Sequence, residues 1–119
     1  MIGALAAVYG FVAVAAAALG AHVVVLEGKP LAWFDTATRL LMFHALALLL
    51  LSAQIRQRPV LLLRWIALGM NLGVWLFCGA LYALAFGAPR ALAHLAPIGG
   101  SALMLSWLLW SWAHLRLRL

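Results

Sequence analysis

A small set of polar side chains interrupts the otherwise apolar stretches of this sequence, and these are the residues whose types could support chemistry. A polar group in the hydrocarbon region of a bilayer costs free energy and usually faces the interior of a helix bundle. Four are expected at a similar depth, near one end of the helices: His22, Asp35, Arg39 and Tyr82. We expect these four to form one polar cluster, which is the candidate site.

The chemistry of this candidate cluster depends on the pair Asp35 and Arg39. The acid precedes the base by four residues, which is the favourable order for an ion pair on a helix, so Asp35 can simply neutralise Arg39. Alternatively, Arg39 forms the cationic floor of an outward-facing pocket with His22 and Tyr82, suited to an anionic or polar solute. A third interpretation is that Arg39 extends to the lipid headgroups. The sequence leaves these three interpretations open.

Two further polar residues, His44 and Asn71, are expected near the midplane of the membrane. Imidazole is a common metal or haem ligand, but on antiparallel helices His22 and His44 would differ in depth by about 8 Å. Cys78 is the only cysteine, which excludes an internal disulfide and a site with several cysteine ligands. We therefore expect no metal and no cofactor, and we predict that His44 and Asn71 form hydrogen bonds between helices.

Four apolar stretches must position these side chains, and each is long enough to cross a bilayer. With 69% hydrophobic and 8% charged residues, the chain differs strongly from an average soluble domain and leaves no room for a catalytic head. We predict an all-α integral membrane protein, with residues 1–119 forming a single transmembrane domain. Short loops favour an up-down-up-down four-helix bundle. The predicted helices cover about residues 2–26, 34–55, 60–87 and 96–115.

The basic residues report on topology rather than on a nucleic-acid partner. The formal net charge is +6, but a nucleic-acid site needs basic residues clustered on a hydrated face, and here they stand at the ends of apolar segments. Arg56, Arg58 and Arg64 surround the second loop, and Arg116 and Arg118 close the sequence. Because cytoplasmic loops carry the Lys/Arg excess, we predict that this loop and both termini are cytoplasmic.

Small residues recur at helical spacing and predict where helices pack closely. Gly10, Ala13, Ala17 and Ala21 form one smooth face of the first segment, and Gly69 and Gly73 form a Gly-x-x-x-Gly pattern in the third. Small residues allow backbones to approach when no hydrophobic force drives association in lipid. The candidate packing positions are Gly10, Ala13, Ala17, Gly20, Gly69, Gly73, Gly79, Gly99 and Gly100.

Four motifs in the same order resemble the YgdD-like family of small inner-membrane proteins. They are Gly20-Ala21-His22, Thr36-Ala37 followed by His44-Ala45-Leu46-Ala47-Leu48-Leu49, Phe77-Cys78-Gly79-Ala80-Leu81-Tyr82, and Pro97-Ile98-Gly99-Gly100 with Trp107 after it. The resemblance covers essentially the whole chain. It implies a four-helix protein of the bacterial inner membrane and does not imply a particular biochemical activity. The sequence departs from the family at Cys78 and Ala80, where serines are usual.

Three functional hypotheses remain open. The first is a non-enzymatic membrane protein that acts in packing or assembly, with the lipid bilayer and either a second copy or another membrane protein as partners. The second is a small transporter or channel that uses the outward-facing polar cluster. The third is a redox, quinone-associated or haem-associated membrane protein that uses His22 or His44. The absence of a recognisable catalytic set favours the first.

The predicted topology can be tested by cysteine labelling. We expect Lys29→Cys, in a Cys78→Ala background, to react with a membrane-impermeant thiol reagent added outside the cell, because the first loop faces away from the basic side. Labelling only from the cytoplasmic side would show that the orientation is the reverse of the predicted one.

Overall fold

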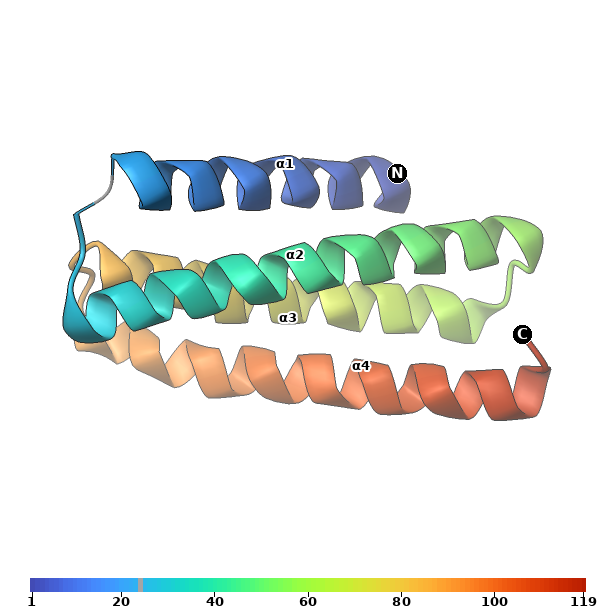
Figure 1. Cartoon of the computed structure of the whole chain (residues 1–119). Coiled ribbons are helices and arrows are strands. Elements are labelled where there is room, and N and C mark those ends of the chain that lie inside the picture. The colour runs from blue at the N-terminus through green and yellow to red at the C-terminus, as the bar shows by residue number, and fades with distance from the viewer. Residues whose placement is uncertain (24) are drawn as a thin grey trace.

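The computed structural model describes residues 1–23 and 25–119 and consists of four long helices (Figure 1). A short 3-10 helix, η1, precedes the last of them. All four helices are long and apolar enough to cross a membrane, which confirms the predicted all-α, four-helix fold. Their bounds are α1 Ile2–His22, α2 Gly28–Gln57, α3 Leu61–Ala85, η1 Arg90–His94 and α4 Leu95–Leu117.

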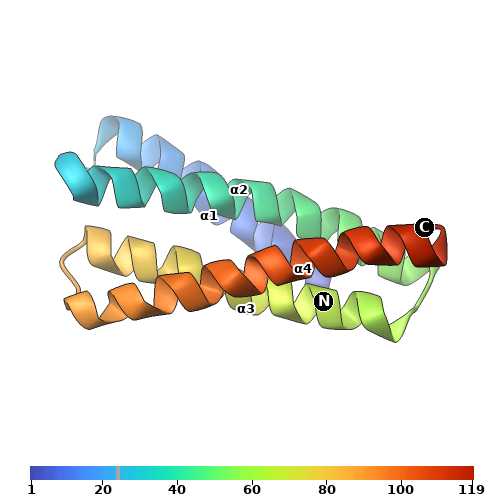
Figure 2. The same ribbon diagram turned by 90° about the horizontal axis from the view of Figure 1, so that it is seen from below.

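The four helices form an elongated layered bundle in which consecutive helices run in opposite directions. Helices α1 and α4 lie on opposite sides of the α2–α3 pair, as the two perpendicular views show (Figures 1 and 2). The N-terminus, the α2–α3 loop and the C-terminus lie at the same end of the bundle. The α1–α2 loop and η1 lie at the other end. The pair α2–α3 is therefore the centre, and it positions every side chain discussed below.

Two helix boundaries differ from the prediction by four residues or more. Helix α1 ends at His22 rather than near Leu26, and residue 24 of the predicted helix lies outside the described residues. Helix α2 begins at Gly28, six residues before the predicted start at Phe34. Pro30 lies in the first turn of α2, where a proline costs little because its missing N–H would have no helical partner.

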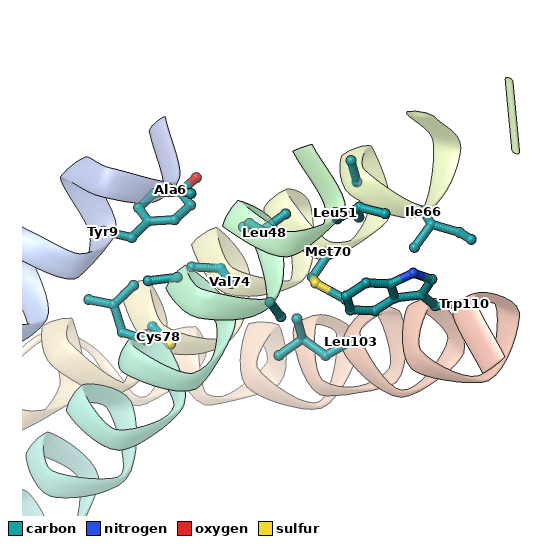
Figure 3. Packing of buried hydrophobic residues seen from close by; sticks show 14 of the residues in the cluster. Ala6, Tyr9, Leu48, Leu51, Ile66, Met70, Val74, Cys78, Leu103 and Trp110 are labelled. Carbon is teal, nitrogen blue, oxygen red and sulfur yellow. The ribbon is translucent and has the colours of Figure 1, made fainter. Parts of the chain in front are cut away.

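The apolar core is built around α2 and α3. Leu48 and Leu51 of α2 and Leu63, Ile66 and Met70 of α3 are the largest fully buried side chains (Figure 3). The outer helices contribute fewer buried residues: Ala6, Tyr9 and Ala13 from α1, and Gly99, Leu103, Ser106, Trp110 and Ala113 from α4. Both outer helices consequently present most of their apolar surface away from the protein.

Helices α3 and α4 approach each other closely at two glycines. A Cβ atom added at Gly73 would lie 2.6 Å from the Leu103 side chain, and one added at Gly99 would lie 2.5 Å from the backbone nitrogen of Phe77. A Cβ at Gly99 would also lie 2.9 Å from the Gly73 carbonyl oxygen. At Gly99 an added side-chain atom would meet the backbone of α3, so this close approach of the two helices requires a residue without a side chain.

Four other candidate packing positions contact neighbouring helices, two of them closely and two at ordinary distances. At Gly69 an added Cβ would lie 2.8 Å from the Ser106 hydroxyl, and at Gly20 it would lie 2.7 Å from the Phe34 ring. Gly10 has Ala45 4.0 Å from such a Cβ, and Gly100 has only ordinary contacts with Phe77, at 3.5 Å.

Two packing predictions require correction. Ala17 is exposed, and so is Ala21, because the face of α1 that meets the bundle runs through Ala6, Tyr9 and Ala13 instead. The large Tyr9 lies on this face, so a pattern of small residues does not reveal it. Gly79 is also exposed, with no atom within 4 Å of an added Cβ, because it lies on the outer face of α3.

The close packing at Gly99 and the open surroundings of Gly79 allow a matched pair of variants. Gly99→Ala should destabilise the protein by about 1–3 kcal/mol, since the new methyl group meets backbone atoms that cannot move cheaply. Gly79→Ala, on the same α3–α4 half of the bundle, should be neutral or slightly stabilising because alanine is the better helix former. Thermal unfolding in detergent measures both. Equal stability of the two variants would contradict the close approach at Gly99.

Candidate functional site

The structure does not bring the four members of the predicted polar cluster together. His22, Asp35 and Arg39 are exposed, and only Tyr82 is half-buried. The buried row of α2 contains Phe34, Ala37, Thr38 and Leu41, so Asp35 and Arg39 share the adjacent outer row one turn apart. A similar depth in the membrane is therefore not enough to predict a cluster, because depth does not determine which face of a helix a residue occupies.

Tyr82 instead pairs with Thr38, a residue that the sequence analysis did not select. Their hydroxyl oxygens are 2.7 Å apart, and this hydrogen bond joins α2 to α3. The Phe34 ring packs edge-on against Tyr82, with ring centroids 5.4 Å apart, and also against Phe86, at 5.9 Å. The signal in the sequence was the spacing of Phe34 and Thr38, which places them on one face of a helix.

A second polar pair joins α1 to α3. The Tyr9 hydroxyl donates a hydrogen bond of 2.7 Å to Asn71 Oδ1, and Asn71 Nδ2 donates one of 2.9 Å to the Ala67 carbonyl oxygen. Asn71 therefore makes the interhelical hydrogen bond that its position suggested, with Tyr9 as the partner. The Trp75 ring meets Tyr9 edge-on, with a centroid distance of 6.4 Å. This pair is the polar attachment of α1 to the centre of the bundle.

The most informative polar residue is His44, which is 5% exposed and joins α2 to α4. Its Nε2 is 3.0 Å from Trp107 Nε1, and its Nδ1 is 2.7 Å from the Leu40 carbonyl oxygen. An indole N–H can only donate and a carbonyl oxygen can only accept. Nδ1 must therefore carry the proton while Nε2 accepts, so both contacts require the same neutral tautomer of His44.

Helices α2 and α4 make a further polar contact closer to their C-terminal ends. Trp110 Nε1 donates a hydrogen bond of 2.8 Å to Gln54 Oε1, and Gln54 Nε2 lies 3.3 Å from His114 Nε2. The rings of Trp107, Trp110 and His114 follow one another along α4, with centroid distances of 5.3 Å and 5.8 Å. The spacing of these rings, at positions i, i+3 and i+7, places them on a single face of the helix.

A groove of about 470 Å³ lies beside this aromatic row, between α2 and α4. It is lined by Leu50, Ala53, Gln54, Gln57, Trp107, Trp110, Ser111 and His114. Among its polar groups, Gln54 and Trp110 bond each other, and Gln57, Ser111 and His114 also line it. The groove offers apolar contact together with hydrogen-bonding groups.

The buried polar side-chain atoms in the described part of the chain are all hydrogen-bonded. Among residues 1–23 and 25–119, no buried side-chain nitrogen or oxygen atom lacks a hydrogen-bond partner. The interhelical bonds use Tyr9 with Asn71, Thr38 with Tyr82, and His44 with Trp107. These polar side chains therefore pair the helices with one another.

Comparison with known proteins agrees with this architecture. A family described as "Protein of unknown function (DUF423)" matches residues 16–100. The chain belongs to this family. Residues 16–100 include His44 and Tyr82 and end before Trp107, so the family match covers the α2 side of the α2–α4 contact but not its tryptophans. No solved structure matches the chain significantly.

Curated family members from several bacteria are similar over most of their length. The UPF0382 inner membrane protein YgdD of Escherichia coli is 34% identical over 115 residues, which are 95% of this chain and 88% of YgdD. A UPF0382 membrane protein of Haemophilus influenzae is 36% identical over 87% of this chain and 85% of its own length. One from Staphylococcus saprophyticus is 32% identical over 88% of each chain. Together with four membrane-length helices, these relatives show a multi-pass inner-membrane protein of the family.

The hydrogen bond between α2 and α4 can be tested within this framework. Trp107→Phe keeps an aromatic ring but removes the N–H that His44 Nε2 accepts. Side-chain hydrogen bonds between membrane helices contribute about 0.6 kcal/mol on average and up to about 1.7 kcal/mol. We expect a loss of this size in the free energy of unfolding in detergent. The control is Trp65→Phe, because Trp65 is exposed. An equal effect of both substitutions would show that the His44–Trp107 bond contributes nothing specific.

Proposed function

We propose that this protein is a non-enzymatic component of the inner membrane that works through contacts between its helices and other membrane proteins or a second copy of itself. The main support for this proposal is that the interior polar side chains form hydrogen bonds between helices. Tyr9, His44 and Tyr82, three interior groups that could otherwise serve acid–base or ligand chemistry, are bonded to residues of other helices. Their arrangement supports a structural role inside the bundle and leaves the outer surface for function.

Helix α1 offers the surface best suited to such contacts. Only three of its 21 residues are buried. Its outward residues include the small side chains of Ala7, Ala17, Ala18 and Ala21 beside the larger Phe11. Within lipid, helices associate mainly through close packing at small residues. The outer surface of α1 is therefore suited to contact another helix, with lipid as the alternative neighbour.

Transport is the weaker hypothesis. A solute pathway through the membrane requires polar side chains that face a water-filled path. The polar groups selected for that role, His22 and Arg39, are exposed on the outside of the described helices. Redox or haem chemistry through His44 is also disfavoured, because both ring nitrogens are already engaged.

The proposed orientation places the N-terminus and the C-terminus in the cytoplasm. One end of the bundle carries Arg56, Arg58, Arg64, Arg116 and Arg118, whereas Lys29, Arg39 and Arg90 lie toward the other end. The basic excess supports assigning the first end to the cytoplasm.

Site-specific photo-crosslinking in native membranes tests the proposed contact surface. A benzophenone amino acid at Ala17, on the outer face of α1, should yield a discrete protein adduct or a dimer. The same probe at Met104, on the exposed face of α4, is the control and should yield much less. Solute flux in proteoliposomes is the companion measurement. Equal crosslinking at both positions, or flux that depends on Arg39, would contradict the proposal.

A further inference from the structure

A cavity of about 770 Å³ opens at the end of the bundle that holds the N-terminus. Its walls come from the first turn of α1, the last turns of α2 and the first turn of α3. Its lining includes Ile2, Leu49, Ser52, Ile55, Arg56 and Arg64. Two arginines from different helices therefore line one cavity with apolar walls.

The cavity follows from the unequal lengths of the helices. Helix α1 has 21 residues and α2 has 30, which correspond to about 31 Å and about 45 Å. Gly3 meets Ser52, where an added Cβ would lie 3.1 Å from the hydroxyl oxygen. Beyond this contact α2 and α3 continue without α1 beside them (Figure 1). The last turn of α2 and the first turn of α3 thus form a shelf beyond the beginning of α1.

Among the described residues, no acidic side chain lies at the end of the bundle that holds the arginines of this cavity. The sequence contains two acidic residues, Glu27 and Asp35, and both lie near the α1–α2 loop at the opposite end. Nor does Ser52 compete for an anion, since its hydroxyl donates to the Leu49 carbonyl oxygen at 2.8 Å. Neither of these acidic side chains is therefore placed to neutralise Arg56 and Arg64.

Other arginines at the same end are engaged differently. Arg58 donates a hydrogen bond of 2.6 Å to the Leu117 carbonyl oxygen and so ties the α2–α3 loop to the end of α4. The Arg116 guanidinium lies 6.0 Å from the centroid of the Trp112 ring. Arg56 and Arg64 are distinguished by facing the cavity together.

We propose that this cavity binds the headgroup of an anionic phospholipid, with Arg56 and Arg64 contacting the phosphate. Guanidinium groups match the oxygen geometry of phosphate through paired hydrogen bonds. Basic pockets between membrane helices are a recurrent type of site for anionic lipid headgroups. The shelf beyond α1 provides the space for the headgroup.

The surroundings favour a lipid over a soluble anion. The cavity wall includes the apolar side chains of Ile2, Leu49 and Ile55, against which the glycerol and upper acyl carbons of a lipid can pack. Trp65, directly after Arg64, is 61% exposed, and exposed tryptophans are typical of the level of lipid headgroups. A lipid satisfies the charged and the apolar parts of the cavity at once.

Native mass spectrometry of the intact protein in detergent, titrated with phosphatidylglycerol and with phosphatidylethanolamine, tests the proposal. The double variant Arg56→Gln, Arg64→Gln should bind phosphatidylglycerol roughly thirtyfold more weakly than the parent, given the contribution of about 1 kcal/mol per basic residue near anionic lipid. The matched control is Arg116→Gln, Arg118→Gln, which removes the same charge from the same end but does not alter the cavity. It should retain the affinity of the parent, and helical circular dichroism checks that each variant folds.

Three results would overturn the proposal. Equal loss of phosphatidylglycerol binding in both double variants would show a general charge effect. Equal binding of phosphatidylethanolamine and phosphatidylglycerol by the parent would show that the anionic headgroup is not recognised. Displacement of phosphatidylglycerol by millimolar inorganic phosphate would assign the arginines to a soluble anion instead.

Discussion

Hydrogen bonding between side chains in an apolar medium determines how these four helices pack. Inside a bilayer no water is available to side-chain donors and acceptors, so each must find a partner in the protein. Tyr9, Thr38 and His44 meet this requirement with side chains of other helices rather than within their own helix alone. The polar residues therefore act as contacts that define which helices are neighbours and in which register they pack.

The layered arrangement follows from how these contacts are distributed. Helices α2 and α3 share the largest buried apolar side chains, and they are joined by Thr38 and Tyr82. Helix α4 adds close backbone packing at Gly99 and hydrogen bonds from its tryptophans. Helix α1 has fewer buried residues and is the least enclosed element. The same organisation accounts for two surfaces of interest, the outer face of α1 and the cavity beyond its first turn.

The sequence predicted the fold well because length and hydropathy suffice to identify helices that cross a membrane. It predicted the polar contacts less well because they depend on helix rotation. Arg39 and Thr38 are neighbours in the chain, yet Arg39 is exposed and Thr38 is buried. Tyr9 and Gln54 were overlooked because each is a single polar residue, and its importance depends on a partner about 60 residues away. Similarly, Gly73 and Gly79 look alike in sequence, but only Gly73 faces α4.

The pairing of helices by interior polar groups requires one particular protonation state of His44. Solid-state ¹⁵N NMR of the histidine-labelled protein in lipid bilayers distinguishes the two neutral tautomers from the charged form. We predict a neutral ring with the proton on Nδ1, because Leu40 offers an acceptor to Nδ1 and Trp107 offers a donor to Nε2. A proton on Nε2, in either the other tautomer or the charged form, would place two donors opposite each other and contradict the pairing of α2 with α4 through His44.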